Sequence, residues 1–92
     1  MSRAVVTFKI MPEAPDTPLG PIEHEAQHIA KKHGAVGDTK ATQEPFAFGL
    51  KIVRVLGMFN VESSDFEAIA AEIEKVAGVQ SAEVEKMDLA LG

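Results

Sequence analysis

Apolar and polar residues alternate along residues 4–11, which predicts a strand with one buried face. A strand with weaker alternation is expected at residues 36–43, and another strand at residues 50–59. The 50–59 segment has apolar residues on both sides, so we expect it to lie centrally in a sheet. A last strand is expected at residues 79–87. The buried face of the first strand would carry Ala4, Val6, Phe8 and Ile10.

Two segments between these strands have the apolar spacing of amphipathic helices. The first helix is expected to begin with Pro18 in the first helical position and to end before Gly34. The second helix is expected to begin with a capping box formed by Ser64 and Glu67. Gly78 would end it, because glycine accepts the left-handed conformation that commonly follows a helix.

The predicted order is therefore strand, helix, strand, strand, helix, strand. Right-handed crossovers place both helices on one face of a four-stranded antiparallel sheet, with the first and third strands in the middle. This is the α+β, ferredoxin-like βαββαβ sandwich. At 92 residues the chain has the length of a single domain, expected to span residues 1–92. The fold alone does not decide the function.

Composition excludes several classes of function. The net charge of −5 argues against a nucleic-acid-binding surface, which is normally basic. No apolar run has the length of a membrane span, and the N-terminus lacks the pattern of a signal peptide. The chain has no cysteine, which excludes a disulfide, a thiolate nucleophile and a cysteine-ligated metal. We therefore expect a cytoplasmic protein that contacts neither membrane nor nucleic acid.

Residues 24–28 read His-Glu-Ala-Gln-His and match the H-E-x-x-H signature of zinc proteases. That chemistry needs two histidines on one helix face, a glutamate as general base, and a third ligand from elsewhere. Here the apolar stripe of the predicted helix lies on the opposite side, so His24 and His28 should face solvent. No functional metal site is expected, although adventitious metal binding by this pair stays open. The phosphate-loop and nucleophile-elbow motifs are missing, so neither an enzyme nor a cofactor is expected.

The most unusual segment is Glu44-Pro45-Phe46-Ala47-Phe48-Gly49-Leu50-Lys51, which lies between two predicted strands. It contains two of the five phenylalanines of the chain. Because full burial of a phenylalanine is worth roughly 1.5–3 kcal/mol, placing two in a turn calls for an explanation. Either one of them is presented to a partner, or both fold back onto the sheet.

Four segments carry a resemblance to a known family. They are Met11-Pro12-Glu13 with Pro15-Asp16, the loop at residues 45–51, the helix at residues 66–78, and the strand that follows Val79-Gln80-Ser81. In these segments the chain resembles the archaeal elongation factor 1-beta family, the nucleotide-exchange factors for the GTPase elongation factor 1-alpha. The loop is the specific part, since the other spacings fit many domains of this topology.

The resemblance implies a function, a partner and a set of contact residues. The function would be to promote GDP release from elongation factor 1-alpha, with no covalent chemistry. Phe48 would insert into an apolar pocket of the GTPase, and Lys51 has a counterpart in eukaryotic relatives. The expected partner-binding residues are Phe46, Phe48, Gly49, Lys51 and Lys86.

The C-terminus departs from the family pattern. In eukaryotic relatives a lysine next to the C-terminus reaches toward the magnesium and phosphate site of the GTPase, whereas alignment on Val79-Gln80-Ser81 puts Leu89 at that position. Lys86 is the nearest cation. Either Lys86 acts from a shifted position, or the factor displaces magnesium mainly through Phe48 and the loop backbone.

An alternative function comes from a different class. A small ferredoxin-like regulatory domain could bind a metabolite and dimerise through its sheet edges. That hypothesis predicts that Phe46 and Phe48 are buried within the domain, whereas an exchange factor is expected to be a monomer that exposes its anchor.

Overall fold

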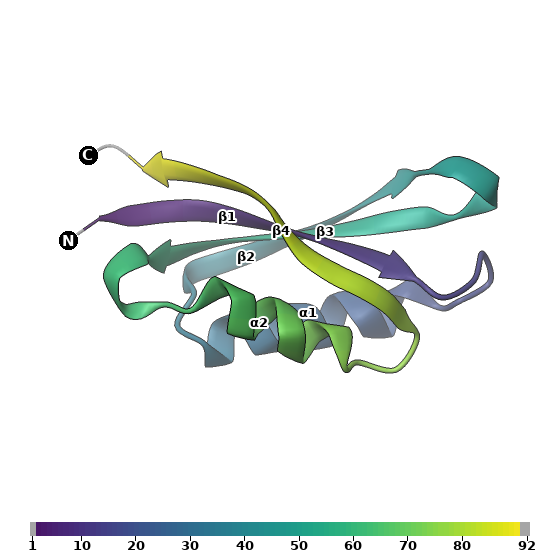
Figure 1. The fold of residues 1–92 in the computed structure, drawn as a ribbon, viewed down its shortest axis with the longest axis horizontal. Helices are drawn as coiled ribbons and strands as arrows, with labels where there is room; N and C mark the ends of the chain where they lie inside the picture. The colour runs from purple at the N-terminus through teal and green to yellow at the C-terminus, as the bar shows by residue number, and fades with distance from the viewer. Residues whose placement is uncertain (1, 91–92) are drawn as a thin grey trace.

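Four antiparallel strands form one sheet in the computed structural model, which describes residues 2–90 (Figure 1). The strand order is β2-β3-β1-β4, so β1 and β3 are central, as the sequence predicted. Neighbouring strands in this order pair along most of their length, and the β1–β3 pair runs in register from Arg3 opposite Asn60 to Ile10 opposite Val53. The strands are β1 (Arg3–Pro12), β2 (Val36–Pro45), β3 (Lys51–Asn60) and β4 (Val79–Ala90).

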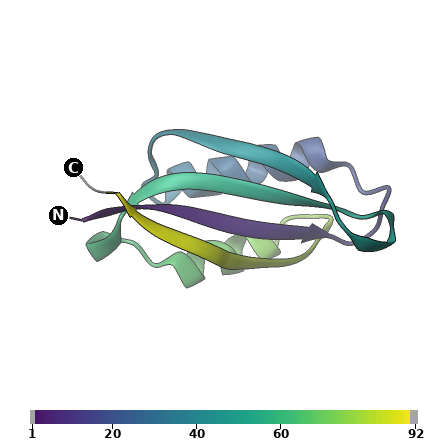
Figure 2. The ribbon, with the colours of Figure 1, turned by 90° about the horizontal axis from the view of Figure 1, so that it is seen from above.

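Two helices cover one face of this sheet and leave the other face open (Figures 1 and 2). They are α1 (Leu19–Lys32) and α2 (Phe66–Glu74), and two short 3-10 turns, η1 (Ala47–Gly49) and η2 (Val61–Ser63), flank β3. The ferredoxin-like arrangement is thereby confirmed. No helix within residues 2–90 is long and apolar enough to cross a membrane.

The core lies between the sheet and the two helices. Phe8 and Phe59 are fully buried with their ring centroids 6.1 Å apart, and the half-buried Phe66 of α2 lies 5.5 Å from Phe59. Both ring pairs are edge-to-face, the arrangement that the charge distribution of aromatic rings favours. Other fully buried side chains come from alternate positions of the central strands and from the inner faces of the helices: Ala4, Val6, Ile10, Val53, Val55, Ala26, Ile69 and Ile73.

The predicted start of each helix is wrong by one residue. Asp65, not Ser64, is the N-cap of α2, and its Oδ1 accepts a hydrogen bond of 3.1 Å from the Ala68 N–H. Aspartate caps as well as serine, so either residue suits this position. Pro18 is the N-cap of α1 rather than its first helical residue, because its ψ of 126° is extended.

The α2–β4 connection also differs from the prediction. The helix ends at Glu74, since Val76 N–H donates to Ile73 in a tighter turn, and the chain reverses through Gly78 at φ +89°. A side chain there would be strained, and a Cβ would lie 2.9 Å from a methyl group of Thr17. Gly78 therefore lets this connection pack closely against the β1–α1 loop.

Candidate functional site

The turn between β2 and β3, residues 45–50, is called the aromatic loop below. Phe46 N–H donates to the Leu50 carbonyl at 2.8 Å, and Leu50 N–H donates to the Ala47 carbonyl at 3.2 Å. Between them Phe48 (φ 61°, ψ 30°) and Gly49 (φ 74°) are both left-handed. Within residues 2–90, Phe48 is the one non-glycine residue with a positive φ. Such a conformation costs roughly 1–2 kcal/mol, so the loop backbone holds Phe48 in a strained position.

The two loop phenylalanines differ in exposure. Phe48 is 93% exposed and Phe46 is 45% exposed. Neither ring belongs to the core, which removes the interpretation that both fold back onto the sheet. A strained backbone that projects a bare aromatic ring into solvent has no value for stability. It is the arrangement expected of a side chain that binds into a pocket on another molecule.

Neighbouring segments surround the aromatic loop. Lys9 of β1 places its Nζ 5.4 Å from the centroid of the Phe46 ring. A Cβ at Gly49 would lie 3.9 Å from the Cβ of Pro15, so the β1–α1 loop lies beside the turn. Lys51 is exposed at the first position of β3, opposite Pro45. Phe46, Phe48, Gly49 and Lys51 therefore share one end of the sheet.

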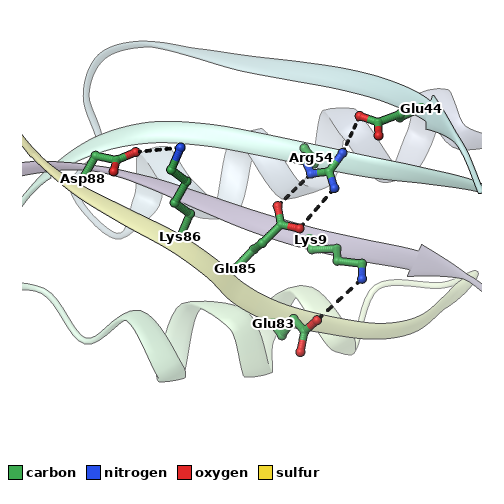
Figure 3. A network of polar contacts seen from close by, with 7 residues as sticks. All are labelled: Lys9, Glu44, Arg54, Glu83, Glu85, Lys86 and Asp88. Atoms are coloured by element: carbon green, nitrogen blue, oxygen red, sulfur yellow. Dashed lines mark hydrogen bonds and ion pairs between the residues drawn. The ribbon is translucent and has the colours of Figure 1, made fainter.

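Lys86 lies apart from these four residues, on the stretch of β4 that leads to the C-terminus (Figure 3). The β1–β4 register explains its direction. Phe8 pairs with Val84 and Thr7 pairs with Lys86, which leaves Glu85 as an extra residue in a β-bulge. Because of the bulge, the side chains of Glu85 and Lys86 are both on the open face of the sheet.

Beyond the bulge, β4 continues three residues further than predicted. Met87 and Leu89 pair with Val6 and Ala4, whose side chains are buried toward the helices. Directly opposed residues share a face, so Met87 and Leu89 lie on the helix side, 44% and 64% exposed. Leu89 and Lys86 thus point to opposite sides of β4. A lysine at position 86 does not reproduce the direction of a side chain at position 89.

Charged side chains cross the open face of the sheet (Figure 3). The Arg54 guanidinium of β3 binds both carboxylate oxygens of Glu85 on β4, at 2.7 and 3.1 Å, and one oxygen of Glu44 on β2, at 2.5 Å. The hydrogen bond from Arg54 lowers the pKa of the Glu85 carboxyl. Lys86 Nζ lies 3.4 Å from an Asp88 carboxylate oxygen. This face is therefore a set of paired charges rather than a basic patch.

Sequence reasoning missed Lys9 and Arg54 as neighbours of the site. Both lie on the open face of the sheet and pair directly across β1 and β3. Their alternation with buried residues was visible, but it is the same signal that any solvent-facing strand residue gives. Only the antiparallel register brings them together.

The H-E-x-x-H pair lies on α1, in the helix layer. His24 and His28 are exposed, as the helical spacing predicted. Among residues 2–90, no three histidine, aspartate or glutamate side chains are grouped closely enough to hold a metal ion. The nearby Glu72 carboxylate binds Lys32 and, at 2.8 Å, the Nε2 of His33. The hydrogen bond from Lys32, and after it the contact with His33, lowers the pKa of the Glu72 carboxyl. Both contacts link α1 to α2.

Comparison with known proteins identifies the family. The family model described as the EF-1 guanine nucleotide exchange domain matches residues 5–89, which include most of every strand and the whole aromatic loop. The chain belongs to this family. The role of the family is guanine-nucleotide exchange, and the resemblance found in the four sequence segments is confirmed.

Curated relatives share nearly the full length of the chain, and each bears the name elongation factor 1-beta. The protein of Pyrococcus horikoshii is 37% identical over 84 residues, covering 88% of both chains. That of Methanosarcina barkeri is 33% identical over 88 residues, covering 91% of this chain and 93% of the relative. That of Methanosphaerula palustris is 27% identical over 89 residues, covering 97% and 99%.

Proposed function

We propose that this chain promotes GDP release from elongation factor 1-alpha by inserting Phe48 into an apolar pocket of that GTPase. The observation that carries the proposal is the 93% exposed ring of Phe48 on a strained, hydrogen-bonded turn. The names of the relatives and of the matching family support the partner. Residues 1–92 would act as a single exchange-factor domain, a monomer in the cytoplasm where translation takes place.

Exchange follows from thermodynamic linkage. An exchange protein that binds the nucleotide-free GTPase more tightly than the GDP-bound GTPase must weaken GDP binding by the same ratio. No bond is made or broken in this scheme, so the chain acts without catalytic side chains of its own. The chain needs only a surface that fits the nucleotide-free GTPase better than the GDP-bound GTPase.

A single aromatic anchor can supply much of the free energy that accelerated GDP release requires. A thousandfold acceleration corresponds to about 4 kcal/mol of barrier reduction. A buried aromatic hot spot supplies about 2–4 kcal/mol, and loss of magnesium coordination in the GTPase can supply the rest. Because the Phe48 backbone is already fixed, little conformational entropy is lost when the ring binds.

The other proposed contact residues would have different roles in binding. Gly49 at φ +74° permits the turn, and any residue with a Cβ at this position would strain it. Phe46 and Lys51 would border the pocket at the same end of the sheet. Lys86 would contact the partner from the open face of the sheet.

Release of a fluorescent GDP analogue from elongation factor 1-alpha tests the proposal. Wild-type protein should accelerate release, and Phe48→Ala should reduce its effect about 30-fold or more, which corresponds to 2 kcal/mol of lost binding. Phe48→Leu keeps most of the apolar area and should fall in between. Both variants should melt at the wild-type temperature, because an exposed ring contributes little to stability.

Two outcomes would contradict the proposal. One is a Phe48→Ala variant with normal exchange, and the other is a collapse of its melting temperature, which would make Phe48 a structural residue. Size-exclusion chromatography adds a direct check on the partner. The chain alone should elute as a monomer, and it should comigrate with nucleotide-free elongation factor 1-alpha.

A further inference from the structure

The aromatic loop has a side-chain connection to the centre of the sheet. Every residue from Pro45 to Gly49 is exposed, so burial in the core does not hold the loop. Lys9, on the central strand β1, lies with its ammonium 5.4 Å from the centroid of the Phe46 ring. A cation within about 6 Å of an aromatic centroid is attracted to the negative face of the ring. Phe46 is also the residue whose N–H closes the loop on Leu50.

The surroundings of Lys9 restrict where its ammonium can lie. Arg54, its direct partner on β3, already places a positive charge over the middle of the open face, where Glu44 and Glu85 bind it. The Lys9 side chain is only 26% exposed and runs along β1 away from Arg54, with Glu83 at 4.0 Å (Figure 3). Repulsion from Arg54 favours this direction. The ammonium then lies within reach of both Glu83 on β4 and the Phe46 ring on the other side of β1.

We propose that Lys9 is a positioning residue for exchange: its ammonium lies against the Phe46 ring, fixes the base of the aromatic loop and so orders Phe48 before the partner binds. The inference rests on the proposed function for its consequence, but the ordering itself is a property of the chain alone. A loop that is ordered in advance loses less conformational entropy on binding. Removing Lys9 should therefore weaken binding and leave the maximal exchange rate unchanged.

Four variants isolate the contact. Lys9→Met keeps the apolar stem and removes the charge, whereas Lys9→Arg keeps a cation that also stacks on aromatic rings. Phe46→Leu removes the ring and keeps apolar volume. Lys40→Met is the matched control, since Lys40 is an exposed lysine opposite Leu56 on the same open face.

The first measurement uses the chain without any partner. Amide ¹⁵N relaxation should show lower order parameters for Phe48 and Gly49 in Lys9→Met and in Phe46→Leu. Lys9→Arg and Lys40→Met should match wild type. Unchanged order parameters in Lys9→Met would overturn the proposal.

The second measurement is the concentration of factor that gives half-maximal GDP release. It should rise about two- to fivefold in Lys9→Met, the range expected for an exposed cation–π contact, with the maximal rate unchanged. The double variant with Phe46→Leu should be no weaker than Phe46→Leu alone, because both changes remove one contact. Additive losses, or a loss equal to that of Lys40→Met, would contradict the role of Lys9. If wild type itself failed to accelerate release, the proposed function would fall, and the relaxation data would still decide whether Lys9 orders the loop.

Discussion

The five phenylalanines of this chain fall into two groups with opposite uses. Phe8, Phe59 and Phe66 form an edge-to-face series between the sheet and α2, and the first two of these are completely buried. Phe46 and Phe48 lie on the aromatic loop and are 45% and 93% exposed. The side chain is the same in both groups, so its hydrophobicity does not explain where it lies.

The backbone around each ring explains the difference. Phe8 and Phe59 occupy alternate strand positions on the side that faces the helices, where the pleat directs them inward. Phe48 occupies a left-handed position in the aromatic loop, and its side chain is almost fully exposed. A ring in the first group stabilises the fold. A ring in the second group leaves about 1.5–3 kcal/mol of burial energy unused in the chain by itself.

The largest expected effect is that of Phe59→Ala on stability. The Phe59 ring is fully buried and contacts both other core rings, and a Cβ at Gly57 would lie 3.0 Å from its Cε2 atom. Truncation should lower the free energy of unfolding by about 3–5 kcal/mol, as measured by urea denaturation. In the same measurement Phe48→Ala should stay within about 0.5 kcal/mol of wild type. Equal losses for the two variants would break the distinction between the groups.

The sequence predicted the first group more fully than the second. Period-two alternation in β1 located Phe8 in the core, because burial of one sheet face leaves a strong local pattern. For β3, which has apolar residues on both sides, the sequence predicted only a central place in the sheet. The loop pair was recognised as unusual from Pro45 and Gly49, yet the residues left two outcomes open. The left-handed φ of Phe48 has no sequence signal, since a non-glycine residue takes this conformation through contacts that exist only in the finished turn, such as its hydrogen bonds.

Helix boundaries and the edge strand show the same limit. The predicted N-cap of α2 was Ser64 and the observed N-cap is Asp65. Both residue types cap helices well, so the sequence alone does not decide between them. The bulge at Glu85 could not be predicted from β4 alone, because it depends on the register with β1. That bulge determines which face of the sheet Lys86 occupies. The role of Lys86 as a partner-binding residue stays a prediction.

Lys86→Ala tests whether the aromatic loop works alone, and its expected effect is smaller. If an ammonium helps to expel magnesium, it must compete for the oxygens that hold the metal. Among residues 86–90, Lys86 is the one cation. The loss of exchange in Lys86→Ala should then be greatest at high magnesium and should shrink when magnesium is chelated.

A magnesium titration of GDP release, with wild type and Lys86→Ala side by side, measures this effect. The contact between Lys86 and Asp88, at 3.4 Å, offers a competing explanation, in which the lysine is a solvent-facing strand residue. Asp88→Asn is the matched control, because it frees the lysine without removing it and should not slow exchange. Parallel curves for wild type and Lys86→Ala would assign magnesium displacement to Phe48 and the loop backbone.

The smallest effect is expected on the helix layer, where the H-E-x-x-H pair offers a second candidate site. His24 and His28 are exposed on α1, which packs against the sheet face opposite Arg54 and Lys86. The double variant His24→Ala with His28→Ala should therefore change exchange and unfolding free energy by no more than about 0.5 kcal/mol. Thermal melting, the GDP-release assay and metal analysis of tag-free protein check the three parts of this expectation. Stoichiometric zinc that disappears in the double variant would show that the helix pair is a true metal site. A loss of exchange in the same variant would show that the partner contacts both layers of the molecule, and the aromatic loop would then no longer account for binding by itself.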